Sequence, residues 1–89
     1  MSLATGDLPS TGQLSATATA AALATNQPCI SVLIQNDPGS SVNVLIGNAT
    51  NQYVQLKPGQ SVTIPCSNAN LIYAKTASST ANVNWLAVQ

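Results

Sequence analysis

A Pro-Gly turn followed by an alternating segment occurs twice in this chain, and it constrains the fold more than any other feature. DPGSSVNVL begins at Asp37 and KPGQSVTIP begins at Lys57. Proline fixes φ for a tight turn, and glycine tolerates the positive φ of a type II turn. In the residues that follow, small polar side chains alternate with β-branched ones, which is typical of a strand with one buried face. Two copies are too few for a solenoid, so the pattern predicts one turn design used twice in a β-sheet domain.

Short segments of the same kind fill most of the chain. Residues 13–25 are rich in alanine but lack a helical apolar stripe, and their Ala/Thr alternation predicts a first strand. In the second segment, Ile30, Val32 and Ile34 are predicted to share one buried face. The later predicted strands span 29–36, 41–48, 51–56, 61–66, 71–76 and 82–89. Six or seven short strands with turns about every ten residues predict an all-β antiparallel sandwich or barrel.

Charged side chains are almost absent, which argues against several classes of function. The chain has 89 residues, of which only Asp7, Asp37, Lys57 and Lys75 are charged, and it contains no histidine. General acid–base catalysis needs a positioned titratable group, and zinc needs more ligands than two cysteines supply. Two lysines neutralise too few phosphates for nucleic-acid binding, and no apolar run is long enough to span a membrane. We predict a protein that is no enzyme, has no catalytic, cofactor or metal site, and binds neither nucleic acid nor membrane.

Small size and zero net charge together favour a subunit of a larger assembly. A domain of this length buries only about 60% of its unfolded surface, so its stability alone is marginal. A net charge of zero also removes the repulsion that keeps small domains apart. A homo-oligomer or a complex with a partner is therefore expected.

The N-terminal residues predict an arm in front of the sandwich domain. Residues 1–12 combine glycine, proline, serine and threonine with isolated leucines, so we expect an arm over 1–12 and a single domain over 13–89. Leu3, Leu8 and Leu14 have few apolar neighbours in the sequence, and docking on a partner would remove them from water. The alternative is a tail without fixed structure.

Three aromatic residues are the other candidates for an interface. Trp85, Tyr53 and Tyr73 are all the aromatic side chains of the chain. Each is either a core or rim residue of the sandwich or an anchor in a contact with a neighbouring subunit. The turn residues have structural roles, and Asp37 is expected to accept hydrogen bonds within its own turn. These turn residues are Asp37, Pro38, Gly39, Pro58 and Gly59.

The two cysteines allow either a disulfide or two separate thiols. Cys66 has the same parity as the apolar Ile64, whereas Cys29 has the parity opposite to Val32. If the apolar residues face the core, the two thiols point to different faces of the sheet. Two separate, half-buried thiols are the preferred interpretation.

The order of these segments resembles a module that is frequent in virion proteins of tailed bacteriophages. The matching segments are CISVLIQNDPGSSVNVLIGN, YVQLKPGQSVTIP, NLIYAKT and VNWLAV, which lie within residues 28–88. As a whole, the short chain is most similar to a capsid cement, or decoration, protein, with a cyanophage as one candidate source. The match is one of turns and alternation, and Pro-Gly turns before SVTI also occur in unrelated β-sandwich proteins.

The resemblance implies a fold, a location and a partner. It implies a jelly-roll-like or immunoglobulin-like sandwich that is made in the host cytoplasm and assembles, as a trimer or dimer, on the outer surface of the capsid. There it would bind the major capsid protein and stabilise contacts between capsomers. A tail-fibre or head-fibre module that recognises host glycans is the main alternative, and a secreted adhesin or pilus-like subunit is a further one.

Overall fold

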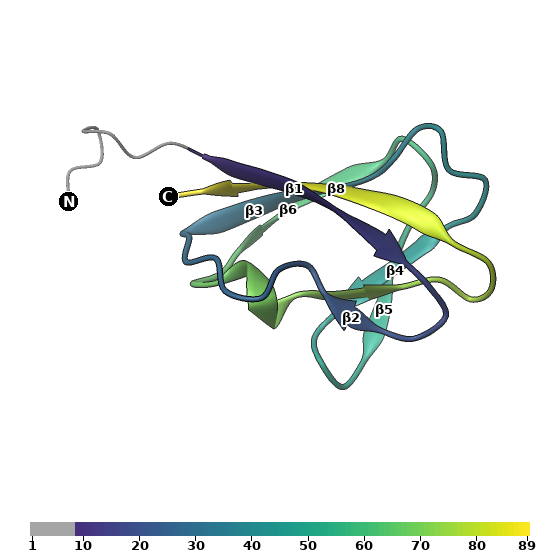
Figure 1. Cartoon of the computed structure of the whole chain (residues 1–89), viewed down its shortest axis with the longest axis horizontal. Helices are drawn as coiled ribbons and strands as arrows, with labels where there is room; N and C mark the ends of the chain where they lie inside the picture. The colour runs from purple at the N-terminus through teal and green to yellow at the C-terminus, as the bar shows by residue number, and fades with distance from the viewer. Residues whose placement is uncertain (1–8) are drawn as a thin grey trace.

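Eight strands and one short 3-10 helix form the part of the chain that the computed structural model describes, residues 9–89 (Figure 1). Every strand pairing among them is antiparallel. The strands are β1 (Ser10–Ala16), β2 (Ala21–Ala22), β3 (Ser31–Asn36), β4 (Val44–Gly47), β5 (Gln52–Leu56), β6 (Ser61–Pro65), β7 (Tyr73–Lys75) and β8 (Ala81–Val88), and the helix η1 (Ala69–Leu71) precedes β7. The predicted all-β fold is confirmed.

The strands form two four-stranded sheets that pack face to face (Figure 1). The first, sheet A, has the order β1-β8-β3-β6, and the second, sheet B, has the order β2-β7-β4-β5. The chain changes sheet at every connection except that between β4 and β5. Eight antiparallel strands wound in this order make the connectivity of a jelly roll, so the sandwich has the first of the two predicted forms.

The beginning of the domain differs from the expected boundaries. Residues 13–25 form parts of two strands in different sheets, because β1 ends at Ala16 and β2 contains only Ala21 and Ala22. This division explains why there are eight strands and not six or seven. At its other end, β1 starts at Ser10, which pairs with Ala87 of β8. Residues 10–12 of the expected arm therefore belong to the sandwich.

The core lies between the sheets and consists of small and β-branched residues. Val32 and Ile34 of sheet A face Val44 and Ile46 of sheet B, and all four are almost completely buried. Alanines occupy several other inner positions, which lets the two sheets approach closely. They are Ala16, Ala69, Ala74, Ala81 and Ala87. Ile30 was expected on the same face but is 67% exposed, because the chain bends at this residue before β3 begins at Ser31.

The two Pro-Gly turns have similar sequences but different geometries. In the second turn the N–H of Gln60 donates to the carbonyl of Lys57, and Gly59 has φ of 88°, as the type II prediction requires. In the first turn the N–H of Ser40 donates to the carbonyl of Asp37. There the carboxylate of Asp37 also accepts the N–H of Gly39 at 2.9 Å. The first turn thus depends on its aspartate, whereas the second depends on a left-handed glycine.

The two turns lie next to each other, and Asn36 joins them. Its backbone N–H donates to Gln60 at 3.0 Å, and its carbonyl accepts the N–H of Gly59 at 2.8 Å. Its buried side chain donates to the carbonyls of Val42 and Leu56, both at 3.0 Å. Because Val42 leads into β4 and Leu56 ends β5, this one amide links sheet A to both strands of the β4–β5 hairpin. The repeated turn motif therefore closes one end of the sandwich.

Candidate functional site

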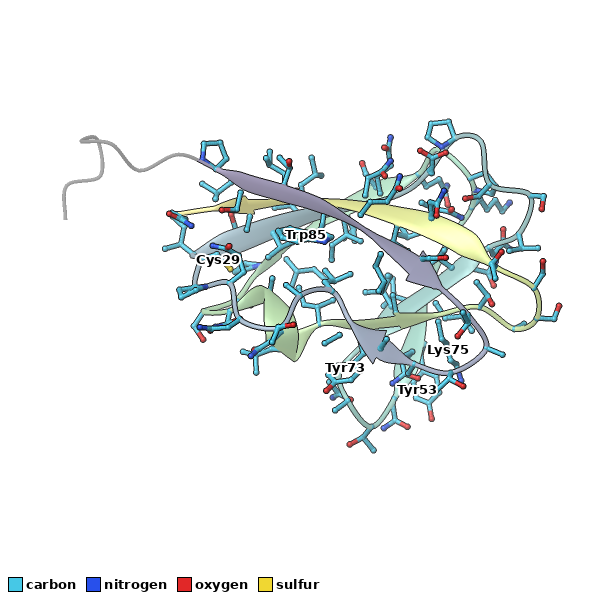
Figure 2. The ribbon with its side chains drawn as sticks, viewed as in Figure 1. Cys29, Tyr53, Tyr73, Lys75 and Trp85 are labelled. Carbon is cyan, nitrogen blue, oxygen red and sulfur yellow. The ribbon has the colours of Figure 1, made fainter. Side chains whose placement is uncertain are left out.

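The outer face of sheet B carries the most exposed aromatic residue of the described chain. Tyr53 of β5 is 81% exposed, and its hydroxyl donates to Oδ1 of Asn51 at 3.0 Å. Tyr73 and Lys75 of β7 point outward on the same side of the molecule (Figure 2). Leu45 lies beside Lys75 on the neighbouring strand. We call this surface, formed by Leu45, Tyr53, Tyr73 and Lys75, the tyrosine face.

A β-bulge fixes the direction in which Tyr53 points. The register between β4 and β5 shifts after Ile46, so that Gly47 pairs with Gln52. A Cβ atom at Gly47 would lie impossibly close to the carbonyl oxygen of Asn51, so only glycine fits where the hairpin closes. Gln52 then points inward and its side chain donates to the carbonyl of Asn48 at 2.7 Å. With Gln52 buried, the next residue, Tyr53, must point into solvent.

The outer face of sheet A carries a row of hydrogen-bonded amides. The side chain of Gln13 donates to Oδ1 of Asn84 at 2.8 Å. The Asn84 amide donates in turn to Oε1 of Gln35 at 3.2 Å and to Oδ1 of Asp37 at 2.9 Å. This ladder runs across β1, β8 and β3 and fixes the orientation of each amide. We call the surface formed by Gln13, Leu33, Gln35, Asn84 and Leu86 the amide face.

A shallow groove lies beside this ladder. It has a volume of about 310 Å³ and lies over β1, β8, β3 and the first residue of β6. Leu33 and Leu86 pair directly across β3 and β8, and Thr11 pairs with Leu86 from the other side. The groove therefore has an apolar floor with the amides of Gln35 and Asn84 beside it. This combination suits a neutral ligand or protein surface that offers both hydrogen bonds and apolar contact.

The remaining aromatic candidate, Trp85, lies inside the sandwich. Its side chain is half-buried, packs against the core and lies over Gly12 of β1 (Figure 2). Leu14 of the same strand also packs against the core and pairs with Val83. Both residues pack against the core, and Trp85 also lines the groove beside the amide ladder. Leu3 and Leu8 lie outside the described residues.

The predicted role of Asp37 is visible in its contacts. The amide of Asn84 and the N–H of Gly39 both donate to its carboxylate, and these hydrogen bonds lower the pKa of Asp37. The negative charge of Asp37 therefore stabilises its own turn and binds the Asn84 amide of the ladder. Pro38, Gly39, Pro58 and Gly59 complete the two turns and lie away from the tyrosine face.

The two cysteines are neighbours, contrary to the parity argument. Their Sγ atoms are 3.9 Å apart, and both thiols are free. The bend at Ile30 reverses the alternation in front of β3, so Ile30 turns outward and Cys29 turns toward Cys66. The alternation of side chains predicts which face of the sheet a residue points to only within a regular strand.

The described residues offer few groups for catalysis or metal binding. Between residues 9 and 89, no three His, Cys, Asp or Glu side chains lie close enough together to hold a metal ion. In the same part of the chain, no helix has the length and apolarity to span a membrane. Apart from Lys75, the chemistry available at both outer faces is hydrogen bonding by neutral groups and apolar contact.

These features define a small all-β protein with jelly-roll connectivity and two uncharged or nearly uncharged outer faces. Comparison of the chain with protein-family models, with curated protein sequences and with solved structures gives no significant match. The function must therefore be argued from the molecule itself.

Proposed function

We propose that the protein is a structural component of a bacteriophage virion that binds the outer surface of the capsid and stabilises contacts between capsomers. The order of its turns and strands supports this, because it resembles a module of tailed-phage virion proteins. Jelly-roll sandwiches are also common in viral capsid proteins. The partner in this proposal is the major capsid protein, and the protein acts by adhesion without a catalytic step.

The observation that carries the proposal is the presence of two distinct adhesive faces on opposite sides of one thin sandwich. The tyrosine face presents Tyr53 and Tyr73, and the amide face presents oriented amides beside Leu33 and Leu86. A protein that stabilises a junction must contact two neighbours at once, and two separate faces allow this. Lys75 is the one charged residue of the two faces. Displacing water from either face on binding therefore requires little desolvation of charged groups.

Assembly into a trimer, or alternatively a dimer, is part of the proposal. Repetition by symmetry multiplies weak contacts, because once one subunit has bound, the others bind at high effective concentration. A neutral domain of this size adds little repulsion between copies. One face can then contact the neighbouring copy while the other contacts the capsid.

A Tyr53→Ser variant tests the proposal. Tyr53 is the most exposed aromatic residue, and tyrosine side chains often dominate the binding energy of an interface. We expect its loss to reduce the affinity for capsids by about tenfold or more, corresponding to roughly 1.4 kcal/mol or more. The measurement is the occupancy of purified capsids that lack the protein, over a titration with each variant.

Leu71→Ser provides a matched control. Leu71 is 53% exposed and lies on η1, outside the residues that define either face, so this variant removes an exposed apolar side chain that is not part of them. We expect Leu71→Ser to bind as the wild type does. Equal occupancy by the wild type and Tyr53→Ser, or no occupancy by the wild type, would contradict the proposal.

The groove on the amide face favours a second candidate, a fibre module that binds host glycans. Oriented amides beside an apolar floor can bind sugar hydroxyls and the apolar side of a sugar ring. A glycan array probed with the isolated protein, with Asn84→Ala and Gln35→Ala as controls, separates the two candidates. Binding that disappears in these variants favours the fibre module, and its absence favours the capsid protein.

A further inference from the structure

Cys29 and Cys66 lie at one end of sheet A, where the chain enters β3 and leaves β6. Figure 2 shows Cys29 at this end. Their Sγ atoms are 3.9 Å apart, although the residues are 37 positions apart in the sequence. The N–H of Cys29 donates to the carbonyl of Ser67 at 3.0 Å, and the N–H of Cys66 donates to the carbonyl of Ile30 at 3.2 Å. These backbone hydrogen bonds place Cys29 opposite Ser67 and Cys66 opposite Ile30, so the two cysteines lie on adjacent antiparallel segments, offset by one position.

We propose that Cys29 and Cys66 form an intramolecular disulfide when the protein meets a small-molecule disulfide such as oxidised glutathione. Directly opposite residues of antiparallel strands have Cα atoms roughly 4.5–5.5 Å apart, and a disulfide spans Cα separations of about 4.4–6.8 Å, which leaves room for an offset of one position. The 3.9 Å between the Sγ atoms shows that the two side chains already point toward each other. The sulfur atoms must approach by about 2 Å to reach bonding distance. Rotation of the half-buried side chains supplies this movement.

The reaction is an exchange in which the small disulfide is reduced and the two cysteines are oxidised. One cysteine loses its proton to water, and its thiolate attacks a sulfur of the small disulfide. A mixed disulfide forms, and the expelled thiolate takes up a proton. The second cysteine then loses its proton and attacks the protein sulfur of the mixed disulfide. This step forms the Cys29–Cys66 bond and releases the second small thiol.

The surroundings of the pair favour a disulfide over a metal site. No third His, Cys, Asp or Glu lies beside the two thiols among the described residues. Burial raises the pKa of Cys29 to about 11, and the hydrogen bond and the charge of the neighbouring Cys66 contribute to the rise. The thiolate is therefore disfavoured here, whereas a disulfide carries no charge and loses nothing by burial.

The bond would fasten an edge strand to the sheet. Within the described sandwich, β6 is an edge strand that pairs with β3 alone. The cross-link would hold the end of β6 against the chain in front of β3. It would also restrict the unfolded chain over the 37 positions between the cysteines. We expect a rise in the melting temperature of roughly 10 °C or more.

The test exposes the reduced, purified protein to a series of glutathione redox buffers at about pH 8.5, where more of each thiol ionises. Free thiols are then trapped with an alkylating reagent, and the intact mass and the melting temperature are measured. Cys29→Ser and Cys66→Ser are the matched variants, since each keeps one thiol but cannot close the bond. The inference does not depend on the proposed function, because the isolated protein suffices.

The expected product is a monomer that has lost two hydrogen atoms and has no alkylated cysteine. Its melting temperature should be higher, and dithiothreitol should reverse both changes. In the single variants oxidised glutathione should leave the melting temperature unchanged. Retained glutathione adducts, disulfide-linked dimers or two free thiols in the wild type would overturn the proposal. If neither serine variant folds, the mass and the thiol count of the wild-type protein alone decide.

Discussion

Asn36 holds together parts of the sandwich that lie far apart in the sequence. Its side chain is fully buried, and its amide donates to carbonyls six and twenty positions away. Its Oδ1 has no hydrogen-bond partner within residues 9–89. The two donated hydrogen bonds stabilise the fold enough to keep a polar side chain in an otherwise apolar core, because they satisfy two backbone carbonyls.

Replacing this amide by a carboxylate should therefore destabilise the protein strongly. In Asn36→Asp the carbonyls of Val42 and Leu56 lose their donor and instead face a buried negative charge. We expect the free energy of unfolding to fall by about 3 kcal/mol or more at neutral pH. Part of the loss should be recovered in acid, where the protonated carboxyl group can donate one hydrogen bond. Urea denaturation at two pH values measures both effects.

Asn82→Asp is the matched control for this variant. Asn82 lies on β8 with its side chain exposed, so the same chemical change occurs in water. Its effect should stay within about 0.5 kcal/mol. Equal stability of Asn36→Asp and Asn82→Asp would show that the two hydrogen bonds of Asn36 contribute nothing.

At the scale of elements, the contact between β1 and β8 depends on the pairing of a large residue with glycine. Gly12 lies opposite Trp85 in the register of the two strands. A Cβ atom on Gly12 would lie only 2.5 Å from the Trp85 ring. The indole covers the glycine, and its Nε1 is buried without a hydrogen-bond partner among the described residues. Packing, and not a hydrogen bond, therefore fixes this ring.

Gly12→Ala should disturb this contact in a way that the tryptophan itself reports. The added methyl group must displace either the ring or the edge strand β1, and we expect a loss of about 1–3 kcal/mol. Denaturation followed by the fluorescence of Trp85, the one tryptophan of the chain, measures both the stability and the shift in the environment of the ring. Ser15→Ala, at an exposed position of the same strand, is the control. A Gly12→Ala variant with unchanged fluorescence and stability would contradict this account.

The sequence predicts these elements well where the information is local. The strands β3 to β7 lie within the predicted segments, and β8 begins one residue before its segment, because alternation and turn residues act over a few positions. The division of residues 13–25 between two sheets was missed, since alanine and threonine carry no signal of the sheet to which they belong. The sequence pattern also gives no sign of the bend at Ile30. The side of the sheet to which Cys29 points was therefore predicted wrongly.

The two outer faces show a similar division between predictable and unpredictable features. Tyr53 and Tyr73 could be named as candidates because aromatic residues are rare in this chain. The amide ladder could not be predicted, because Gln13 and Asn84 are 71 positions apart and meet only through the register of β1 with β8. Residues that act through pairing between distant strands become visible only when the topology is known.

At the scale of the whole molecule, near-absence of charge governs how the protein can bind. The full chain has two positive and two negative side chains and a net charge of zero. The carboxylate of Asp37 is already occupied by Asn84 and Gly39. Long-range attraction can therefore contribute little to the encounter with a capsid. In the proposed function, binding therefore relies on short-range contacts of the tyrosine and amide faces, and such contacts are hardly affected by ionic screening.

The affinity for capsids should accordingly change little with salt. We expect less than about a twofold change in the dissociation constant when the salt concentration rises about tenfold, since only interactions between charges are screened. Gln55→Glu and Gln55→Lys test whether the assay can detect an electrostatic contribution to binding. Gln55 suits this test because it is exposed and pairs with Leu45 of the tyrosine face. A charged capsid surface should attract one variant and repel the other, and both differences should shrink in high salt. A wild-type affinity that falls by about tenfold or more over the same range would mean that Lys57, Lys75 or Asp7 dominates the contact and that the neutral faces do not.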